Sequence, residues 1–171
     1  VNMLILLDFL GSLQLYSSDI GAGATAETTI YTLKMYGFIP IVYNRTYERA
    51  VALKARYPGL IVCKELKELD DLIEDIALIV STTPGSADLQ IPDRFFEHHP
   101  ICFDVSIIPK QTPFLSRAMK NGCKDLIYGI EMLLYQGYMQ QDIFTGKRCV
   151  RKAFKAAALN YYETVLKSLS K

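Results

Sequence analysis

Two kinds of apolar pattern alternate along the chain between about residue 19 and residue 128. Short runs that are apolar throughout predict buried strands, and segments in which apolar residues recur every three or four positions predict amphipathic helices. The expected strands are 39–43, 60–63, 76–80, 101–105 and 126–128, and the expected helices lie around 26–33, 46–57, 65–72 and 114–119. Wholly apolar strands separated by helices are typical of a parallel sheet covered on both faces, so we expect one doubly wound α/β domain.

A further helical pattern closes the chain. Between residues 150 and 165, five apolar residues fall on one stripe, and the lysines of this segment lie mostly off it. We expect this stripe to face the core, as the apolar side of an amphipathic helix does. Its residues are Val150, Phe154, Ala157, Tyr161 and Val165.

Composition and charge narrow the possible partners. The 171 residues are 50% hydrophobic and 22% charged, which provides enough apolar material for a core and too little charge for a disordered chain. Lys and Arg number 19 and Asp and Glu number 18, so the net charge is +1. The whole chain therefore has no electrostatic footprint for nucleic acid or for an anionic membrane, and we expect neither as a partner.

The cysteines and histidines predict no metal site, because no CxxC pair occurs and the two histidines are adjacent. Four separate thiols are typical of a reducing, cytoplasmic setting. The apolar start of the chain is interrupted by Asp8 and is shorter than the roughly 20 residues of a membrane span, so it predicts neither a span nor a signal peptide. Because the chain opens at Val1 without an initiator Met, we expect a fragment of a longer protein.

A glycine-rich turn precedes the first expected helix. The segment Gly21-Ala22-Gly23-Ala24-Thr25-Ala26 matches the G-x-G-x-x-G/A fingerprint of dinucleotide-binding folds. Gly21 permits the tight turn, Gly23 lets a pyrophosphate approach the backbone, and the helix N-terminus favours phosphate. A purely structural Ala/Gly turn is the alternative explanation. The preceding segment 16–20 is polar and makes a poor buried strand, although a Rossmann-like sheet places its first strand there.

The end of the second expected strand indicates which cofactor fits. An NAD site carries Asp or Glu there to bind the ribose hydroxyls, about 20 residues after the glycines. This chain has Asn44-Arg45-Thr46, with Arg49 one helical step further on. A guanidinium group pairs with a 2′-phosphate through two charge-assisted hydrogen bonds, whereas a carboxylate repels it. The pattern favours NADP, and the alternative is a polar helix start with solvated arginines.

Several further motifs follow in an order that resembles a known family. The motifs are Ser81-Thr82-Thr83-Pro84, then Asp104 followed by Pro109, Thr112, Pro113, Phe114 and Leu115, and then Gly129-x-x-Met132-Leu133-x-x-Gln136. Together with the glycine turn and Asn44-Arg45-Thr46, the series resembles the C-terminal, NADP-binding half of shikimate dehydrogenase and of the quinate/shikimate dehydrogenases. It also resembles the dehydrogenase domain of the fungal pentafunctional shikimate-pathway protein and the fungal quinate repressor, over about residues 21–146.

The resemblance implies a role for each matching residue. It implies that the glycine-rich turn holds the pyrophosphate and that Asn44, Arg45, Thr46 and Arg49 clamp the adenosine phosphate. At the other end of the cofactor, the resemblance implies that Thr82, Thr83 and Pro84 lie along the nicotinamide ribose. It implies that Gly129 and Met132 lie near the nicotinamide ring, and that Gln136 contacts a hydroxyl of shikimate or quinate. An ordinary surface amide is the alternative for Gln136.

The chain departs from the family pattern in the part that supplies the substrate site. In the family, a separate N-terminal domain provides most of that site, including a catalytic Lys–Asp pair. Only Asp8 resembles the aspartate segment at the end of that domain, and no Lys precedes it. We therefore expect residues 1–20 to be a degenerate remnant of that domain and of the first strand, and 21–171 to be the NADP-binding domain. Ile107 stands where the family has a substrate-contacting Tyr.

Three functions are compatible with these observations. The first is the cofactor-binding part of an enzyme that oxidises shikimate reversibly to 3-dehydroshikimate with NADP, with Asp8 as the candidate catalytic residue. The second is a non-catalytic sensor or repressor module of quinate and shikimate metabolism, which the missing Lys and Tyr favour. The third is a degenerate domain without a ligand, which the polar first strand favours.

Overall fold

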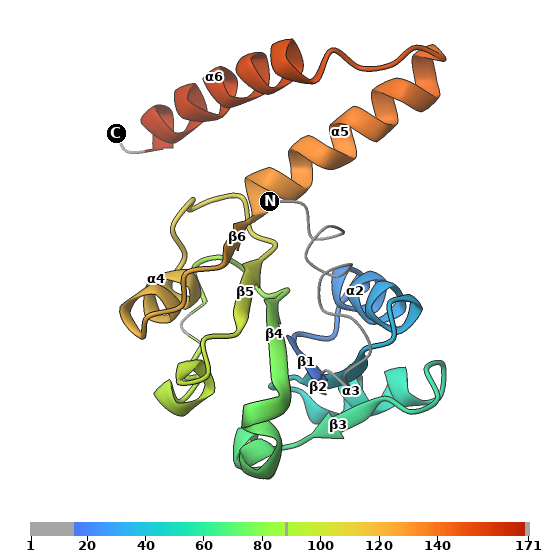
Figure 1. Cartoon of the computed structure of the whole chain (residues 1–171), viewed down its shortest axis with the longest axis vertical. Coiled ribbons are helices and arrows are strands. Elements are labelled where there is room, and N and C mark those ends of the chain that lie inside the picture. The colour runs from blue at the N-terminus through green and yellow to red at the C-terminus, as the bar shows by residue number, and fades with distance from the viewer. Residues whose placement is uncertain (1–15, 88, 170–171) are drawn as a thin grey trace.

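Six parallel strands form the central sheet of the computed structural model, which describes residues 16–87 and 89–169. The strands lie in the order β3-β2-β1-β4-β5-β6 (Figure 1). They are β1 Tyr16–Ile20, β2 Ile39–Tyr43, β3 Ile61–Cys63, β4 Ile76–Ser81, β5 Ile101–Asp104 and β6 Leu126–Tyr128. The chain order reverses between β1 and β4, and open α/β sheets bind ligands in the crevice at the carboxyl ends of such a pair of strands.

The first strand is intact, which corrects the expectation drawn from its polar sequence. β1 pairs in parallel with β2 on one side and with β4 on the other. A strand between two neighbours satisfies its backbone N–H and C=O groups through both ladders, whatever its side chains are. Segment 16–20 therefore belongs to the sheet. Residues 1–15, including Asp8, lie outside the described residues, so their assignment as a domain remnant stays a prediction.

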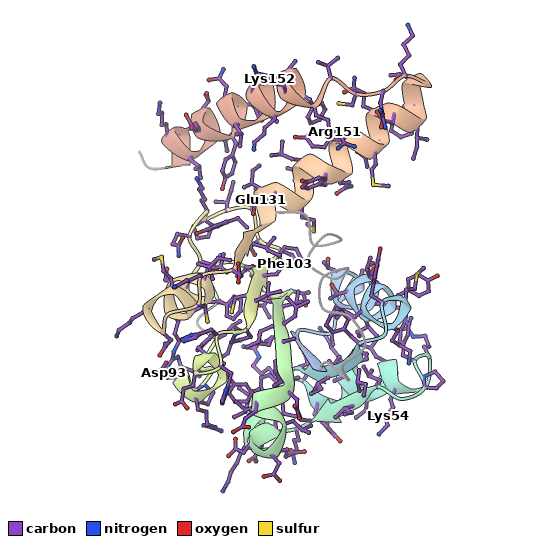
Figure 2. The ribbon with its side chains drawn as sticks, in the orientation of Figure 1. Lys54, Asp93, Phe103, Glu131, Arg151 and Lys152 are labelled. Carbon is purple, nitrogen blue, oxygen red and sulfur yellow. The ribbon has the colours of Figure 1, made fainter. Side chains whose placement is uncertain are left out.

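Helices cover both faces of the sheet, which confirms the expected doubly wound, Rossmann-like fold (Figure 1). They are the α-helices α2 Ala24–Met35, α3 Tyr47–Lys54, α4 Pro113–Lys120, α5 Gly129–Thr145 and α6 Arg151–Leu169, with the 3₁₀ helices η1 Leu66–Asp75 and η2 Asp93–Phe96. Alternate strand residues point to opposite faces. Ile41 thus belongs to the cluster that includes η1, η2 and α4, and its neighbour Val42 to the cluster that includes α2 and α3. Phe103 on β5 is buried in the middle of the molecule (Figure 2).

The last two helices extend from the sheet. α5 begins directly after β6, and α6 runs back along α5 (Figure 1). The expectation that the stripe from Val150 to Val165 faces the core is wrong, because Val150 is 69% and Tyr161 is 72% exposed. A narrower strip of α6, which includes Phe154 and Ala158, packs against α5. Within the described residues α6 packs mainly on a single helix, so only part of its apolar surface is covered.

The cysteines of the described chain are free thiols. All four cysteines are buried and none is in a disulfide. Burial raises the pKa of the Cys63 thiol to about 11, so this thiol is protonated and unreactive at neutral pH. No helix within the described ranges is both long and apolar enough to cross a membrane.

Candidate functional site

The candidate residues that the structure describes gather at one edge of the sheet. The glycine-rich turn follows β1, Asn44-Arg45-Thr46 follows β2, Thr82-Thr83-Pro84 follows β4, and Gly129 follows β6. All strands are parallel, so their carboxyl ends share this edge. The structure thus brings together segments that are more than 100 residues apart in the sequence, from Gly21 to Gly129. The edge lies at the switch between β1 and β4, where ligands bind in open α/β sheets.

Gly21 is required by the fold itself. Its φ is +141°, and a Cβ added to it lies 2.1 Å from the Thr82 Oγ1. Its N–H donates to the Tyr43 carbonyl oxygen at 2.9 Å, and the Thr82 N–H donates to the Ile20 carbonyl oxygen at 3.0 Å. The turn is therefore held between the ends of β2 and β4, with no room for a side chain.

Gly23 has no comparable need within the described chain. Its φ is −97°, which any residue adopts, and no described heavy atom lies within 4 Å of an added Cβ. It is the exposed N-cap of α2, and no described side chain caps this helix. The first N–H groups of α2 are thus left for solvent or for an anion, to which a helix N-terminus is suited. Ala26 is fully buried, which lets α2 lie close to the sheet.

The segment after β2 presents two exposed cations, Arg45 and Arg49. The Asn44 side-chain amide donates to the Thr46 carbonyl oxygen at 2.7 Å and so fixes the turn into α3. Arg45 and Arg49 are exposed, and neither forms an ion pair with any described acidic residue. Thr46 is the N-cap of α3, but its hydroxyl makes no capping hydrogen bond. These groups are available to an anionic ligand.

The loops after β4 and β5 are tied together by hydroxyl groups. The Thr82 hydroxyl donates to the Ile20 carbonyl oxygen at 3.1 Å, and the Thr83 and Ser81 hydroxyls are 3.2 Å apart. The Ser106 hydroxyl donates to the Thr83 carbonyl oxygen at 3.1 Å. Pro84 is exposed at the tip. These hydrogen bonds give the loop a defined shape.

Asp104 lies beneath these loops, at the last position of β5. It is 2% exposed, and its Oδ1 accepts from the Ser106 N–H at 2.9 Å. Burial raises the pKa of the Asp104 carboxyl, and hydrogen bonds with the Ser106 N–H and with the Thr112, Ser106 and Ser81 hydroxyls offset part of this rise. Sequence reasoning used Asp104 as a motif position and gave it no role. An Asp that ends an otherwise apolar strand was the available signal.

α5 carries the remaining candidates on one face. Gly129, Met132 and Gln136 are spaced i, i+3 and i+7, which places them on the same side of a helix. Gly129 is buried, and Met132 is half-buried against the core cluster of β4, β5 and β6. Gln136 is exposed, and its side-chain amide has no hydrogen-bond partner among the described residues. It is therefore free to contact a ligand.

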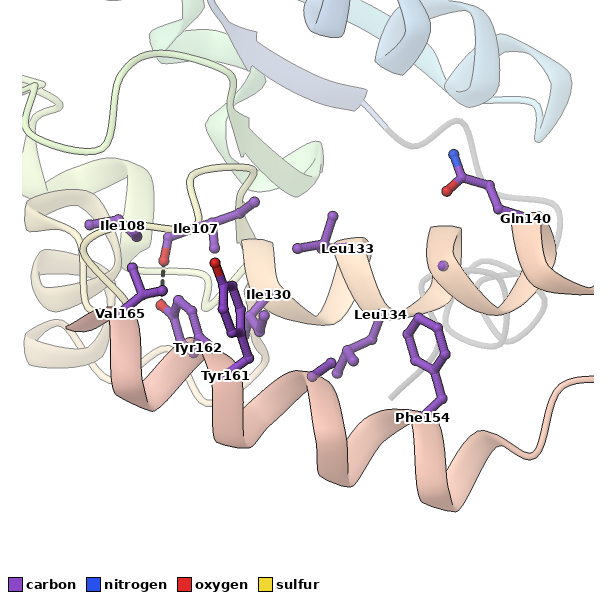
Figure 3. Close-up of a pocket in the computed structure, with 12 residues that line it drawn as sticks. Ile107, Ile108, Ile130, Leu133, Leu134, Gln140, Phe154, Tyr161, Tyr162 and Val165 are labelled. Atoms are coloured by element: carbon purple, nitrogen blue, oxygen red, sulfur yellow. Dashed lines mark hydrogen bonds between the residues drawn. The ribbon is translucent and has the colours of Figure 1, made fainter. Parts of the chain in front are cut away.

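An apolar groove of about 400 Å³ runs between α5, α6 and the loop after β5 (Figure 3). Ile107, the residue in place of the family's Tyr, lines this groove together with Tyr161 and Leu133. The Tyr162 hydroxyl donates to the Ile107 carbonyl oxygen, which ties α6 to this loop. Gln140 lines the groove, whereas Gln136 does not. At this position the surface is apolar, without the hydroxyl that the resemblance implies.

Comparisons with known proteins agree on one family. The family description "Shikimate / quinate 5-dehydrogenase" matches residues 18–100. The chain is 33% identical over 135 residues to shikimate dehydrogenase (NADP(+)) of Archaeoglobus fulgidus, a match that covers 74% of this chain and 49% of that protein. It is 30% identical over 158 residues to the pentafunctional AROM polypeptide of Malassezia globosa, which covers 81% of this chain and 10% of that protein.

Solved structures give the same result. Shikimate 5-dehydrogenase of Thermus thermophilus in complex with NADP(H) and shikimate has a TM-score of 0.71 and 25% identity, over 92% of this chain and 60% of that one. Quinate dehydrogenase of Corynebacterium glutamicum in complex with NAD has a TM-score of 0.73 at 19% identity, over 89% of this chain and 57% of that one, which shows the fold alone. This chain spans about half the length of the curated dehydrogenases that it matches.

Proposed function

The chain belongs to the shikimate/quinate dehydrogenase family as an NAD(P)-binding domain, and on this premise we propose that it binds NADP(H). Homologues bind either NAD or NADP, so the family alone leaves the choice of cofactor open. The observation that carries the choice is the pair of exposed arginines after β2, which have no acidic partner among the described residues. No carboxylate stands among Asn44, Arg45 and Thr46 to bind ribose hydroxyls.

The rest of the site fits an extended dinucleotide. In this proposal the pyrophosphate lies over the open space at Gly23, against the N-terminus of α2, and the 2′-phosphate lies between Arg45 and Arg49. The nicotinamide ribose lies along Thr82, Thr83 and Pro84, and the ring lies near Gly129 and Met132. The described loops supply hydroxyls and backbone groups at this end, which suit a neutral sugar and an amide.

In an intact enzyme of the family, the site's chemistry is the oxidation of shikimate to 3-dehydroshikimate. Bound NADP⁺ supplies the hydride acceptor for that chemistry. The residues of this chain anchor the cofactor at the arginine end and orient it at the Thr83 end, and the Gln136 amide holds a substrate hydroxyl. Such positioning is a large part of catalysis, because reacting atoms must lie in near-attack geometry. The proton transfer requires a further acid–base group, for which Asp8 stays the proposed candidate.

A second candidate function is a regulatory module that binds the ligands without turnover. The specific observation in its favour is Ile107, which lies in an apolar groove where the family has a substrate-contacting Tyr. In this function, binding of the cofactor or of quinate is read by a partner protein, and no hydride moves.

Titration with NADPH and NADH tests the proposal. A ligand present at 100 times its Kd raises the stability of the fold by about 2.7 kcal/mol, which is readily seen as a rise in Tm. We expect NADPH to raise Tm more than NADH at equal concentration. If both cofactors raise Tm equally, the choice of NADP is contradicted. If neither raises Tm, the result supports the third function considered above, a degenerate domain without a ligand.

A further inference from the structure

We propose that Asp104 is a positioning residue, whose buried carboxylate sets the shape of the loops that hold the nicotinamide half of the cofactor. This inference rests on the proposed function and adds to it a residue outside the cofactor contacts. Asp104 cannot contact the cofactor directly, because its side chain is buried and the residue is only 2% exposed. It acts through its neighbours in the loops after β4 and β5.

Stability alone does not account for this carboxylate. No described Lys, Arg or His forms an ion pair with Asp104, so hydrogen-bond donors alone compensate its charge. Buried ionic groups are costly to desolvate, and apolar residues of similar volume in their place are often neutral or stabilising. The residue therefore has a use other than strengthening the core.

The hydrogen bonds of Asp104 lead into the loop that carries Thr83. The Ser106 N–H donates to the Asp104 Oδ1 at 2.9 Å, and the Ser106 hydroxyl donates to the Thr83 carbonyl oxygen at 3.1 Å. The Ser81 hydroxyl also bonds to Asp104 and lies 3.2 Å from the Thr83 hydroxyl. The carboxylate is thus connected through Ser106 to the Thr83 carbonyl oxygen and through Ser81 to the Thr83 hydroxyl.

The turn after β5, at Val105 and Ser106, also sets the start of α5. A Cβ added to Gly129 lies 2.3 Å from the Ser106 carbonyl oxygen and 2.4 Å from that of Val105. The first residue of α5 is therefore packed directly on the turn that Asp104 fixes. A Cβ added to Gly85 lies 2.7 Å from the Ser106 Cβ, so the loop after β4 also rests on this serine. Ser106 links Asp104 to both loops of the nicotinamide end.

Asp104→Asn tests this arrangement, because Asn keeps the size of the side chain and removes the charge that holds the donors. We expect NADPH affinity to fall about ten-fold or more, as for the loss of a charged hydrogen-bonding group. Adenosine 2′,5′-bisphosphate, which has the 2′-phosphate and the adenosine 5′-phosphate but no nicotinamide half, is expected to bind the variant as it binds the unmutated chain. A merely structural role weakens both ligands together.

Calorimetric titration of the full chain with both ligands separates the outcomes. Ser106→Ala removes the hydroxyl that bonds to the Thr83 carbonyl oxygen and contacts Asp104, while the carboxylate and its bond from the Ser106 N–H stay in place. It therefore carries the same test if Asp104→Asn fails to fold. Asp70→Asn is the matched control, because it removes a carboxylate from an exposed ion pair with Arg94 and is expected to change neither affinity. Equal losses for both ligands, or no loss of NADPH affinity, overturn the inference. If the unmutated chain binds neither ligand, the proposed function falls and the inference falls with it.

Discussion

Gly21 and Gly23 belong to one fingerprint, yet the structure gives a different physical reason for a glycine at each of the two positions. Gly21 has a left-handed φ and is enclosed by Thr82, whereas Gly23 has an ordinary φ and open space around it. A sequence motif does not make this distinction, because it records only the residue type. The distinction separates Gly21, which the fold needs, from Gly23, for which a ligand is the proposed reason.

We expect Gly21→Ala to affect mainly the stability of the fold and Gly23→Ala mainly the affinity for NADPH. Gly21→Ala is expected to lower the free energy of unfolding by more than about 2 kcal/mol, through strain at positive φ and the clash with Thr82. Gly23→Ala is expected to change it by about 1 kcal/mol or less, since only the N-cap preference is affected. NADPH affinity should nevertheless fall in Gly23→Ala, because the methyl group occupies the space proposed for the pyrophosphate. Urea unfolding and NADPH titration measure the two effects, and a Gly23→Ala variant with unchanged affinity contradicts the proposed pyrophosphate position.

Arg45 is expected to govern the choice between the two cofactors. A charge-assisted hydrogen bond contributes about 1.5–3 kcal/mol, so Arg45→Ala should weaken NADPH binding roughly ten-fold or more and leave NADH nearly unchanged. Arg49→Ala should act in the same direction but less, because it reaches the phosphate from the first turn of α3. Higher salt should likewise weaken NADPH more than NADH, since exposed charges are screened over about 10 Å at 0.1 M. Titrations of both cofactors check this, and an equal loss for both would mean that Arg45 supports the fold or stacks on adenine.

At the scale of the elements, the apolar pattern predicted most of the fold and failed in two places. The strands 39–43 and 126–128 coincide with β2 and β6, because their side chains are in contact with helices on both faces. β1 gives no such signal, since an interior strand is held by backbone pairing that side-chain patterns do not encode. The apolar stripe on α6 led to the wrong prediction that this side of the helix is buried. Apolar residues repeat along it, but the described chain buries only part of them.

The contact between α5 and α6 rests on a small number of side chains. The Phe154 ring meets the Tyr138 ring edge-on at 5.4 Å, and it lies so close to Gly137 that an added Cβ would be 2.6 Å from its Cζ. Phe154→Ala should therefore loosen α6 from α5, at a cost below the about 3–5 kcal/mol of a fully buried Phe because this ring is only half-buried. Hydrogen exchange is the suitable measurement. Faster exchange in α6 with an unchanged sheet is expected, and equal loss of protection in both would mean that the helices and the sheet unfold as one unit.

At the scale of the whole molecule, the candidate site is assembled from the ends of five strands. The glycine turn was found through its fingerprint and the arginines through their place after the second expected strand. The Thr83 loop and Gln136 came from the family resemblance. In the structure each of these follows a strand at this edge or lies on the helix that does. Sequence reasoning gave no role to Asp104 and Ser106. The role proposed for them depends on contacts between loops that lie more than 20 residues apart in the sequence, and no local pattern encodes such contacts.

The last prediction concerns turnover. None of the described residues assigned to the site is a Lys or a His, and the Asp104 carboxylate is buried beneath the loops. Loss of a general acid–base group alone typically slows a reaction about 10²–10⁴-fold. The surface that the resemblance assigns to the substrate domain is also not among the described residues. We therefore expect the chain by itself to produce no measurable NADPH from shikimate and NADP⁺ at 340 nm.

A chimera distinguishes the reasons for such inactivity. The part of the Archaeoglobus fulgidus enzyme that this chain does not match can be joined ahead of residue 16, which supplies the proposed Lys–Asp pair and leaves residues 16–171 unchanged. If the cofactor half is competent, this chimera should oxidise shikimate, and Arg45→Ala within it should raise the KM for NADP⁺ more than it lowers kcat, because the 2′-phosphate is remote from the reacting carbon. A chimera that binds NADPH yet remains inactive would instead favour the regulatory module, with Ile107→Tyr as the next substitution to restore activity. Steady NADPH production by the unmodified chain would contradict the prediction outright, and would mean that this sequence contains its own acid–base group.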